Sequence, residues 1–408
     1  MCTQNFLSDS IEHARKAALS ILQPTPSQLE YGLELHRNSL VIDSYGFAPR
    51  ADVDDEVLAE AAQNGATAYE IEELSGEMAM LGMADNEAYK STFIQAFEAA
   101  GVTCIFQNAG EENNNIETLL RRFGRFTYAA DAMPDVLRRA TDPRDILAAR
   151  AEGKRCLYLS TNGVPLPGRF RNTTEAIEFI RTFFQLGARM MHLTYNRRNL
   201  IGDGCGESTD GGLSEFGRAV VEEMNRVGVI ADIAHCGIQT GLDAARCSEK
   251  PVVISHAPCA ALSDHCRAKT DELIRAVADG AGLIGIVCLP SMLQASGDIN
   301  ALLDHIDHVV QLAGFDYVAI GTDRSAPTYE RRARPADFPR SRTRFESLWP
   351  ARDANVDRQW SKPEQNESLS WTNWPLFTVG MVQRGYSEAN IQKVLGGNML
   401  RVAQAALH

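Results

Sequence analysis

The chain lacks the long apolar runs of a membrane protein and the basic excess of a nucleic-acid-binding protein. No stretch approaches the roughly 20 apolar residues of a transmembrane helix, and the N-terminus has no basic start followed by the apolar core of a signal peptide. Asp and Glu outnumber Lys and Arg by 53 to 40, and the net charge of −13 argues against a polyanionic partner. We therefore expect a cytoplasmic protein whose partner is neither nucleic acid nor a membrane.

Paired cysteine motifs are also lacking. The nine cysteines are odd in number and are scattered along 408 residues without CxxC spacing. This pattern is typical of free thiols rather than of a disulfide framework. The composition, 44% hydrophobic and 23% charged, is that of a globular protein with a large buried core.

Short apolar runs rich in β-branched residues alternate with stretches of helical periodicity along most of the chain. This alternation is typical of β–α units repeated around a parallel sheet. Eight runs are expected as strands: Ser39–Asp43, Val102–Gln107, Cys156–Ser160, Met190–Tyr195, Val229–His235, Val252–His256, Leu283–Leu289 and Tyr317–Asp323. Eight such units favour a closed (β/α)8 TIM barrel over an open doubly wound sheet.

Helices are expected between these runs and at the end of the chain. They are Glu87–Ala100, Ile116–Ala130, Thr173–Leu186, Ser214–Val227, Asp271–Asp279, Asn300–Ala313 and Ser387–Ala406. Ser214, Asp271 and Ser387 are expected as N-caps, because their side-chain oxygens can accept a hydrogen bond from an unpaired helix N–H.

One long segment after the eighth run has little periodicity. Residues 324–370 are rich in Arg, Pro, Asp and Ser, and all four tryptophans lie in or beside this segment. A loop of this length inside a compact domain is usually functional or disordered, and its place after the eighth strand predicts a lid or a dimer arm over the catalytic face. We expect one barrel domain over residues 1–408, with a helical extension at about 1–37 and this loop at about 324–370.

Most of the expected strands end in, or are soon followed by, a residue that can bind a metal, titrate or form hydrogen bonds. These residues are Asp43, Gln107, Asn162, Tyr195, His235, His256 and Asp323. In a TIM barrel the carboxyl ends of the strands converge on one face, where the active site is built. A single residue of this kind is more often part of a turn or a satisfied core group. His235, His256 and Asp323 together, on three strands, favour a functional site.

Four segments of the second half resemble the signature segments of the membrane (renal-type) dipeptidase family, within the amidohydrolase superfamily. They are GLSEFGRAVVEEMNRVGVIADIAHC, PVVISHAPCAALSDHCRA, YVAIGTD and RGYSEANIQKVLGGNMLRV, and they span roughly Gly211 to Val402 in the family's order. The LTYNRRNLIGDGC segment near Leu193 resembles bacterial members, whereas the first 150 residues match only loosely. The resemblance implies a barrel of the metal-dependent hydrolase type with two zinc ions at the strand ends, and, by analogy, a homodimer.

The resemblance carries over to four positions of this chain. Histidines on two later strands of the family hold one metal, and these positions read His235 and His256. Arg267 stands where the family binds the substrate carboxylate, and Asp323 matches the Asp that ends the last strand. The resemblance therefore implies His235, His256 and Asp323 as metal ligands, Arg267 as a substrate-binding residue, and Asp323 and His256 as catalytic residues.

Other positions depart from the family pattern. Tyr45 and Phe47 stand where a His and an Asp ligand follow the first strand, and Asn162 stands where a Glu bridges two metals. A neutral amide cannot offset the repulsion between two divalent ions, Phe offers no lone pair, and Tyr is a poor zinc ligand. Tyr195 replaces a substrate-binding His, and we expect Tyr195 and Asn162 to contact the substrate, with Tyr195 also catalytic. The sequence predicts one zinc ion at most.

Three functions are open on the sequence. The first is a metal-dependent amidohydrolase acting on a small dipeptide-like or N-acyl amino-acid substrate, in which zinc activates water, Asp323 takes and returns the proton, and Arg267 pairs with the substrate carboxylate. The second is a non-hydrolytic barrel enzyme, an isomerase or lyase, with His235, His256, Tyr195 and Asp323 as acid–base groups. The third is a carboxylate-binding pseudo-enzyme. One barrel supports many chemistries, so the fold does not decide among them.

Overall fold

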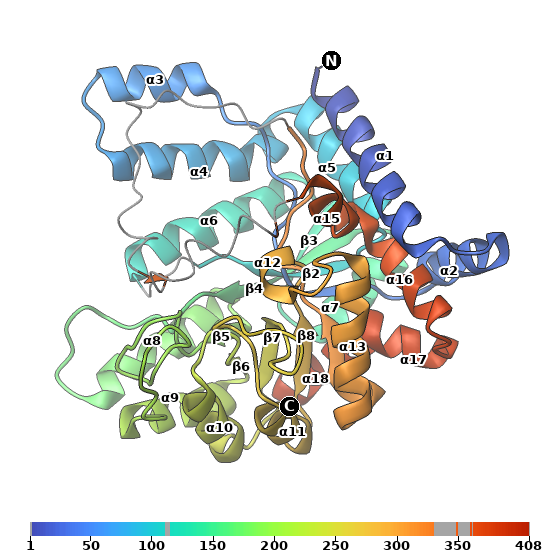
Figure 1. Cartoon of the computed structure of the whole chain (residues 1–408). Coiled ribbons are helices and arrows are strands. Elements are labelled where there is room, and N and C mark those ends of the chain that lie inside the picture. The colour runs from blue at the N-terminus through green and yellow to red at the C-terminus, as the bar shows by residue number, and fades with distance from the viewer. Residues whose placement is uncertain (1, 111–114, 330–347, 350–359, 361, 408) are drawn as a thin grey trace.

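The computed structural model describes residues 2–110, 115–329, 348–349, 360 and 362–407 (Figure 1). Most of the segment predicted as a lid or dimer arm lies outside the described residues, so its role stays a prediction. Two helices, α1 (Cys2–Leu22) and α2 (Pro26–Asn38), occupy the N-terminal stretch. A capping box between Thr25 and Gln28 begins α2. The division into one domain with an extension and a loop stays a prediction.

The described residues form nine parallel strands in one sheet. They are β1 (Ile42–Gly46), β2 (Cys104–Asn108), β3 (Leu137–Ala140), β4 (Arg155–Thr161), β5 (Met190–His192), β6 (Ile230–Asp232), β7 (Val253–Ala257), β8 (Leu283–Ile286) and β9 (Val318–Ile320). Eight of them pair in the order β1-β2-β4-β5-β6-β7-β8-β9. The first and last strands also meet, because the Asp323 N–H donates to the Tyr45 carbonyl at 2.9 Å and the Phe47 N–H to the Arg324 carbonyl at 3.0 Å. The predicted (β/α)8 barrel is confirmed.

Two details of the predicted strands are corrected. β3 was not expected, because its sequence LRRA has no β-branched residue; it pairs with β4 outside the barrel path. The first run was placed too early, since β1 extends from Ile42 to Gly46 rather than over Ser39–Asp43.

The helices surround the barrel (Figure 1). Those between the strands are α3 (Asp55–Gln63), α4 (Ala68–Asp85), α5 (Glu87–Ala100), α6 (Ile116–Ala132), α7 (Pro143–Ala151), α8 (Thr173–Gln185), α9 (Glu215–Val227), α10 (Ile238–Cys247), α11 (Asp271–Asp279), α12 (Pro290–Leu293) and α13 (Ile299–Ala313), with a 3-10 turn η1 (Phe315–Tyr317). Those after β9 are α15 (Pro363–Ser368), η3 (Trp371–Asn373), α16 (Trp374–Gln383), α17 (Glu388–Gln392), η4 (Lys393–Gly397) and α18 (Asn398–Leu407). α3 and α4 form a pair at the upper left of the view. No described helix is long and apolar enough to span a bilayer.

The helix caps agree with the sequence at two of three positions. Ser214 and Ser387 are N-caps, of α9 and α17. Asp271 is instead the first residue of α11, because the hydroxyl of Thr270 accepts the hydrogen bond from the Leu273 N–H. The last predicted helix is divided into α17, the π-helical turn η4 and α18.

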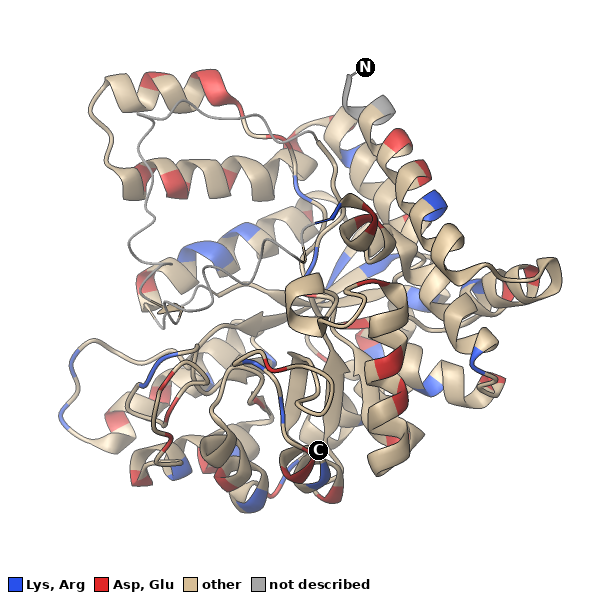
Figure 2. Ribbon diagram, in the orientation of Figure 1, with Lys and Arg blue, Asp and Glu red and all other residues tan. Residues whose placement is uncertain are grey.

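The two faces of the sheet belong to two separate apolar clusters. Ile105 and Leu157 pack in the larger cluster, with the apolar faces of the outer helices. Alternate residues such as Phe106, Tyr158 and Met190 form the smaller cluster inside the barrel. The interior is thus a packed core, and only the carboxyl ends of the strands are left to build a site. Acidic and basic residues are interspersed over the outer helices in this view (Figure 2).

Candidate metal centre

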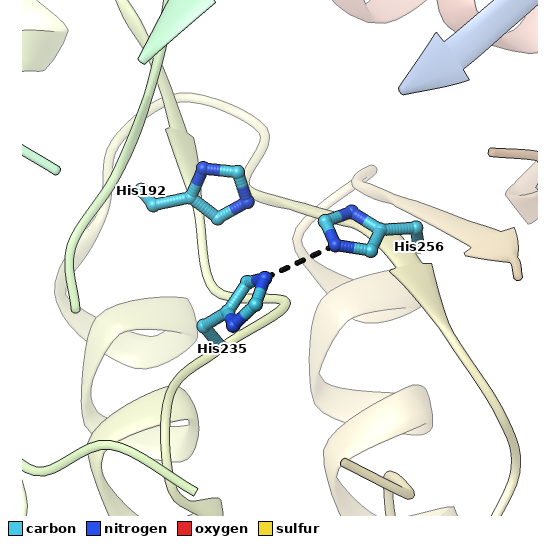
Figure 3. Close-up of side chains that lie close together, drawn as sticks. All are labelled: His192, His235 and His256. Atoms are coloured by element: carbon cyan, nitrogen blue, oxygen red, sulfur yellow. Dashed lines mark hydrogen bonds between the residues drawn. The ribbon is translucent and has the colours of Figure 1, made fainter. Parts of the chain in front are cut away.

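Three histidines on neighbouring strands converge at the carboxyl ends of the barrel strands. His192 ends β5, His235 follows β6 and His256 lies in β7. One ligand atom of each lies within 4.8 Å of the others, and all three side chains are buried. The close-up shows the three rings facing one another (Figure 3). Among the described residues, these three histidines form a group of His, Cys, Asp or Glu side chains that are close enough together to hold a metal ion.

His235 and His256 are placed as neutral ligands. Their Nε2 atoms lie 3.1 Å apart. Burial, and then the positive charge of Arg267, lowers the pKa of each imidazole well below its ordinary value. Nδ1 of His235 donates to Oδ1 of Asn196 at 2.7 Å, which leaves its Nε2 lone pair toward His256. Both rings are therefore unprotonated at neutral pH, as metal binding requires.

His192 faces a buried carboxylate. His192 and Asp232 are register partners on β5 and β6, and both are fully buried. His192 Nε2 lies 3.0 Å from Asp232 Oδ2. Burial alone would raise the pKa of Asp232, but His192 and hydrogen bonds from Ser255 and Ala234 outweigh it, and the pKa lies below its ordinary value. Asp232 is thus a buried anion beside the three imidazoles.

Tyr45 lies against His192 and His256 and holds Asn162 by a hydrogen bond. The Tyr45 hydroxyl donates to Oδ1 of Asn162 at 2.5 Å. The Tyr45 ring stacks on His256 with 3.9 Å between ring centroids, and Phe47 meets Tyr45 edge-on at 5.9 Å. Aromatic rings thus cover the side of His256 where the family resemblance implies further metal ligands.

Tyr195 and Asn196 support His235 from the loop after β5. The Tyr195 ring stacks on His235 with 4.1 Å between centroids. Oδ1 of Asn196 accepts hydrogen bonds from His235 and, at 3.2 Å, from the thiol of Cys205. This loop therefore fixes the orientation of one imidazole.

Arg267 is almost completely buried and bonds the backbone next to His235 and at His256. Its Nε donates to the Ala234 carbonyl at 3.2 Å and its Nη2 to the His256 carbonyl at 2.9 Å. The guanidinium therefore ties together the two strand ends that carry His235 and His256, and after burial its charge is the largest of several causes that lower their pKa values.

The two strand-end aspartates lie in different surroundings. Asp323 is half-buried, has a φ of 54°, and is not a member of the three-histidine group among the described residues. Asp43 is fully buried and accepts hydrogen bonds from the Thr322 hydroxyl at 2.5 Å and from the Trp371 indole N–H at 3.0 Å. Burial raises the pKa of Asp43 to about 7. Asp43 thus joins β1 to the end of β9 and to η3.

The donor set fits one zinc ion better than two. Three imidazoles with an open fourth position are a common catalytic zinc site. Nε2 of His192 and Oδ2 of Asp232, both buried, face each other at 3.0 Å without hydrogen-bond geometry, so neither atom is fully satisfied by the other. The side chains of Tyr45, Phe47 and Asn162 supply no carboxylate or imidazole for a second ion.

The sequence reasoning missed His192 and Asp232. The fourth expected run, Met190–Tyr195, was predicted to end at Tyr195, but β5 ends at His192, two residues beyond the inward-facing Met190. Asp232 likewise follows the inward-facing Ile230 by two. The period of two along each strand was the signal that would have placed both side chains inside the barrel.

Fold and site together define an amidohydrolase-type barrel with an imidazole cluster at its carboxyl face. The chain belongs to the membrane dipeptidase family (peptidase family M19), whose model matches residues 35–329. Dipeptidase verJ of Clonostachys rogersoniana is 26% identical over 226 residues, which cover 55% of this chain and 50% of that protein. The match thus spans about half the length of this curated relative.

Solved structures share the fold. An amidohydrolase from Pseudomonas aeruginosa has a TM-score of 0.67 and 24% identity, covering 92% of this chain and 99% of that one. The probable dipeptidase PvdM of the same organism has a TM-score of 0.66 and 18% identity, covering 94% and 99%. A metallo peptidase from Rhodobacter sphaeroides, liganded with a phosphinate mimic of the dipeptide L-Ala-D-Ala, has a TM-score of 0.64 and 16% identity, covering 90% and 99%.

Proposed function

We propose that this protein is a metal-dependent hydrolase that cleaves the amide bond of a small dipeptide-like or N-acyl amino-acid substrate and holds at most one zinc ion. The observation that carries the proposal is the convergence of buried imidazoles, within 4.8 Å of one another, at the carboxyl face of a dipeptidase-family barrel. Neutral imidazole is a ligand suited to zinc, and the packed barrel interior leaves this face as the place for chemistry.

The proposed roles divide among residues around the cluster. His235 and His256 hold the ion. His256 is counted among the catalytic residues because it binds this ion. Zinc, when bound, supplies positive charge that polarises a carbonyl and lowers the pKa of water. Asp323 takes the proton from the attacking water and returns it to the leaving amine.

Substrate contacts are proposed for three further residues. Tyr195, whose ring stacks on His235, and Asn162, which accepts a hydrogen bond from Tyr45, are proposed to contact the substrate. Arg267 is proposed to attract the substrate carboxylate, because its buried positive charge lies beside the His256 carbonyl. A small substrate with a carboxylate, a homodimer and a cytoplasmic location complete the proposal.

The limit of one ion rests on the aromatic side chains beside His256. Tyr45 stacks on the His256 ring and bonds Asn162, so the side chains at these family ligand positions contact each other rather than converge as donors. An amide in place of a carboxylate provides no charge to hold two divalent cations together.

Metal content and substrate turnover test the proposal. Protein purified without chelators is analysed for zinc and is then assayed with L,L-dipeptides, L,D-dipeptides and N-acyl amino acids. We expect at most one zinc per chain, turnover of at least one N-acyl or dipeptide-like compound, and loss of that turnover on chelation. Two tightly held ions, or turnover that chelators do not change, would contradict the proposal. A protein that binds no metal and hydrolyses nothing would favour the isomerase, lyase or carboxylate-binding alternatives.

A further inference from the structure

The inward-facing end of β5 carries a histidine that the family resemblance does not assign. His192 is completely buried and lies in phase with Met190 of the barrel interior. Its ring meets His235 and His256 edge-on, with centroid separations of 5.1 and 5.6 Å. His192 therefore belongs to the same cluster as the two predicted metal ligands (Figure 3).

The spacing within the cluster suits a single ion. Ligand atoms around a tetrahedral zinc ion, with bonds of about 2.0–2.1 Å, lie about 3.3 Å apart. The Nε2 atoms of His235 and His256 are separated by 3.1 Å. Only a small adjustment of these two rings is needed for one ion to bind both.

Each of the three rings is also held by its second nitrogen. Nδ1 of His192 lies 2.9 Å from the Thr161 carbonyl, Nδ1 of His235 bonds Asn196, and Nδ1 of His256 lies 2.7 Å from the Ser255 hydroxyl.. Metal-binding histidines almost always have such a partner on the nitrogen that does not face the ion. At all three positions, the Nδ1 contact is therefore of the kind that orients a metal-binding histidine.

A buried carboxylate lies beside His192, which is itself fully buried. A backbone carbonyl only accepts, so Nδ1 of His192 donates to the Thr161 carbonyl, and Nε2 is the nitrogen that remains for Asp232 or a metal ion. That Nε2 lies 3.0 Å from Asp232 Oδ2, yet the two atoms lack hydrogen-bond geometry and have no other partner. A buried carboxylate at this position is stabilised by positive charge in the imidazole cluster, which a bound metal ion would supply.

We propose that His192 is the third protein ligand of a mononuclear zinc site formed with His235 and His256, and that Asp232 is the buried anion that stabilises this ion. The proposal rests on the proposed function in one respect, namely that the same site binds a metal. Asp323 is then left outside the ligand set, as the proton acceptor.

Zinc and cobalt binding to the metal-free protein test this assignment. Isothermal titration with Zn²⁺ is carried out on the unaltered chain and on the variants His192→Gln, Asp232→Asn and Asp323→Asn. We expect one ion for the unaltered protein, an affinity at least about 100-fold weaker for His192→Gln, and one roughly 10- to 100-fold weaker for Asp232→Asn. Asp323→Asn is the matched control and should bind zinc as the unaltered chain does. Unchanged affinity in His192→Gln, or loss of binding in Asp323→Asn alone, would overturn the assignment.

A second variant separates loss of a ligand from loss of folding. His192→Cys keeps a zinc ligand at the position but changes its chemistry. Its Co²⁺ complex should gain the near-ultraviolet absorption of a thiolate bound to cobalt, relative to the Co²⁺ complex of the unaltered protein. A Co²⁺ complex of His192→Cys without this absorption would show that residue 192 does not bind the metal. Circular dichroism of each metal-free variant checks that the barrel is intact.

The outcomes also separate this assignment from the proposed function. If the unaltered protein binds one ion through residue 192 but hydrolyses none of the test compounds, the assignment stands and the proposed function fails. If hydrolysis depends on metal while His192→Gln keeps full zinc affinity and activity, the proposed function stands and the assignment fails.

Discussion

The hydroxyl of Tyr45 donates a 2.5 Å hydrogen bond to the side-chain oxygen of Asn162, although the two residues are 117 positions apart in the chain. The family resemblance implies a metal-ligating His at the first position and a bridging Glu at the second. In this chain the two substitutions thus complete each other, because the phenol supplies the donor that the buried amide oxygen needs. Such coupling makes the effect of changing either residue depend on the other.

Restoring the family residues together should rebuild a second metal position. The triple variant Tyr45→His, Phe47→Asp and Asn162→Glu is expected to raise zinc content toward two ions per chain and to increase turnover of simple L,L-dipeptides, which the unaltered protein should cleave poorly. Elemental analysis and a dipeptide assay measure both. Each single change should do little for metal binding, since each ligand works only with its partners present. Rapid L,L-dipeptide cleavage by the unaltered chain would show that the ligands were misassigned.

Asn162→Glu alone should destabilise the apo protein by roughly 1–3 kcal/mol, because it buries a carboxyl group beside Tyr45 without a compensating cation. The melting temperature checks this change. Asn162→Gln, which keeps an amide, is the matched control for side-chain length. Equal melting temperatures for the Glu and Gln variants would contradict the prediction.

Arg267→Lys is expected to weaken both the protein and the site. A lysine cannot donate to the Ala234 and His256 carbonyls in the fork geometry of the guanidinium, so the free energy of unfolding should fall by roughly 2 kcal/mol. Binding of a carboxylate substrate should weaken as well, and denaturant unfolding and KM measure the two effects separately. Arg275→Lys, a change outside the site, is the control. A variant with unaltered stability and KM would remove Arg267 from both roles.

His36 should make the fold sensitive to acid. Its ring is buried between the Thr378 hydroxyl and the Ala100 carbonyl, and burial lowers its pKa to about 4 from 6.5. Because the folded pKa is depressed, this contribution is full above pH 6.5 and is lost as the pH falls toward 4, by up to roughly 3 kcal/mol. His36→Gln should remove this part of the pH dependence of unfolding, whereas His13→Gln, at an exposed position, should not. The same pH profile in His36→Gln as in the unaltered protein would contradict the prediction.

Asp43 should have the opposite pH dependence. Burial raises its pKa to about 7 from 3.8, so its contribution to stability is full below pH 3.8 and is lost as the pH rises to 7, by up to roughly 4 kcal/mol. Asp43→Asn mimics the protonated carboxyl, so the free energy of unfolding should no longer fall between pH 4 and 7. The increase in stability with pH that His36 contributes should then become visible. Denaturant unfolding at several pH values between 4 and 7 measures the change. A profile in Asp43→Asn that still falls as strongly with pH would show that another group is responsible.

The sequence predicted the barrel well because its strands are marked locally. β-branched runs and the glycine- or serine-bounded helices between them identify eight of the nine described strands, and β3 was missed because LRRA carries no such mark. Thr270 rather than Asp271 caps α11 because two capping residues stand side by side, and the local sequence does not decide between them.

Within the site, His235 and His256 were predicted from sequence motifs, whereas His192 was not. The position of His192 depends on where β5 ends, and that end is set by register pairing of His192 with Asp232 on β6. The alternation along β5 assigns His192 to the inward face, but its place opposite Asp232 comes from pairing between strands 40 residues apart, which is a tertiary property. The same holds for the Tyr45–Asn162 bond, since each residue alone is an ordinary strand-end residue.

The seam between β1 and β9 has a consequence for the order of folding. Asp43 bonds Thr322 across 279 positions of the chain, and the Asp323 N–H bonds Tyr45 in the same seam. Contacts of such long range carry a large loop-closure cost, so we expect the seam to form after the local β–α units between β4 and β8. Hydrogen exchange during refolding would then show the Asp323 amide protected later than the amides of β5 and β6. In a folding chain, the strands that carry the three histidines would then form before the seam places Tyr45 and Asp323 beside them. On this order of events, the histidines are available to bind a metal ion before the barrel closes.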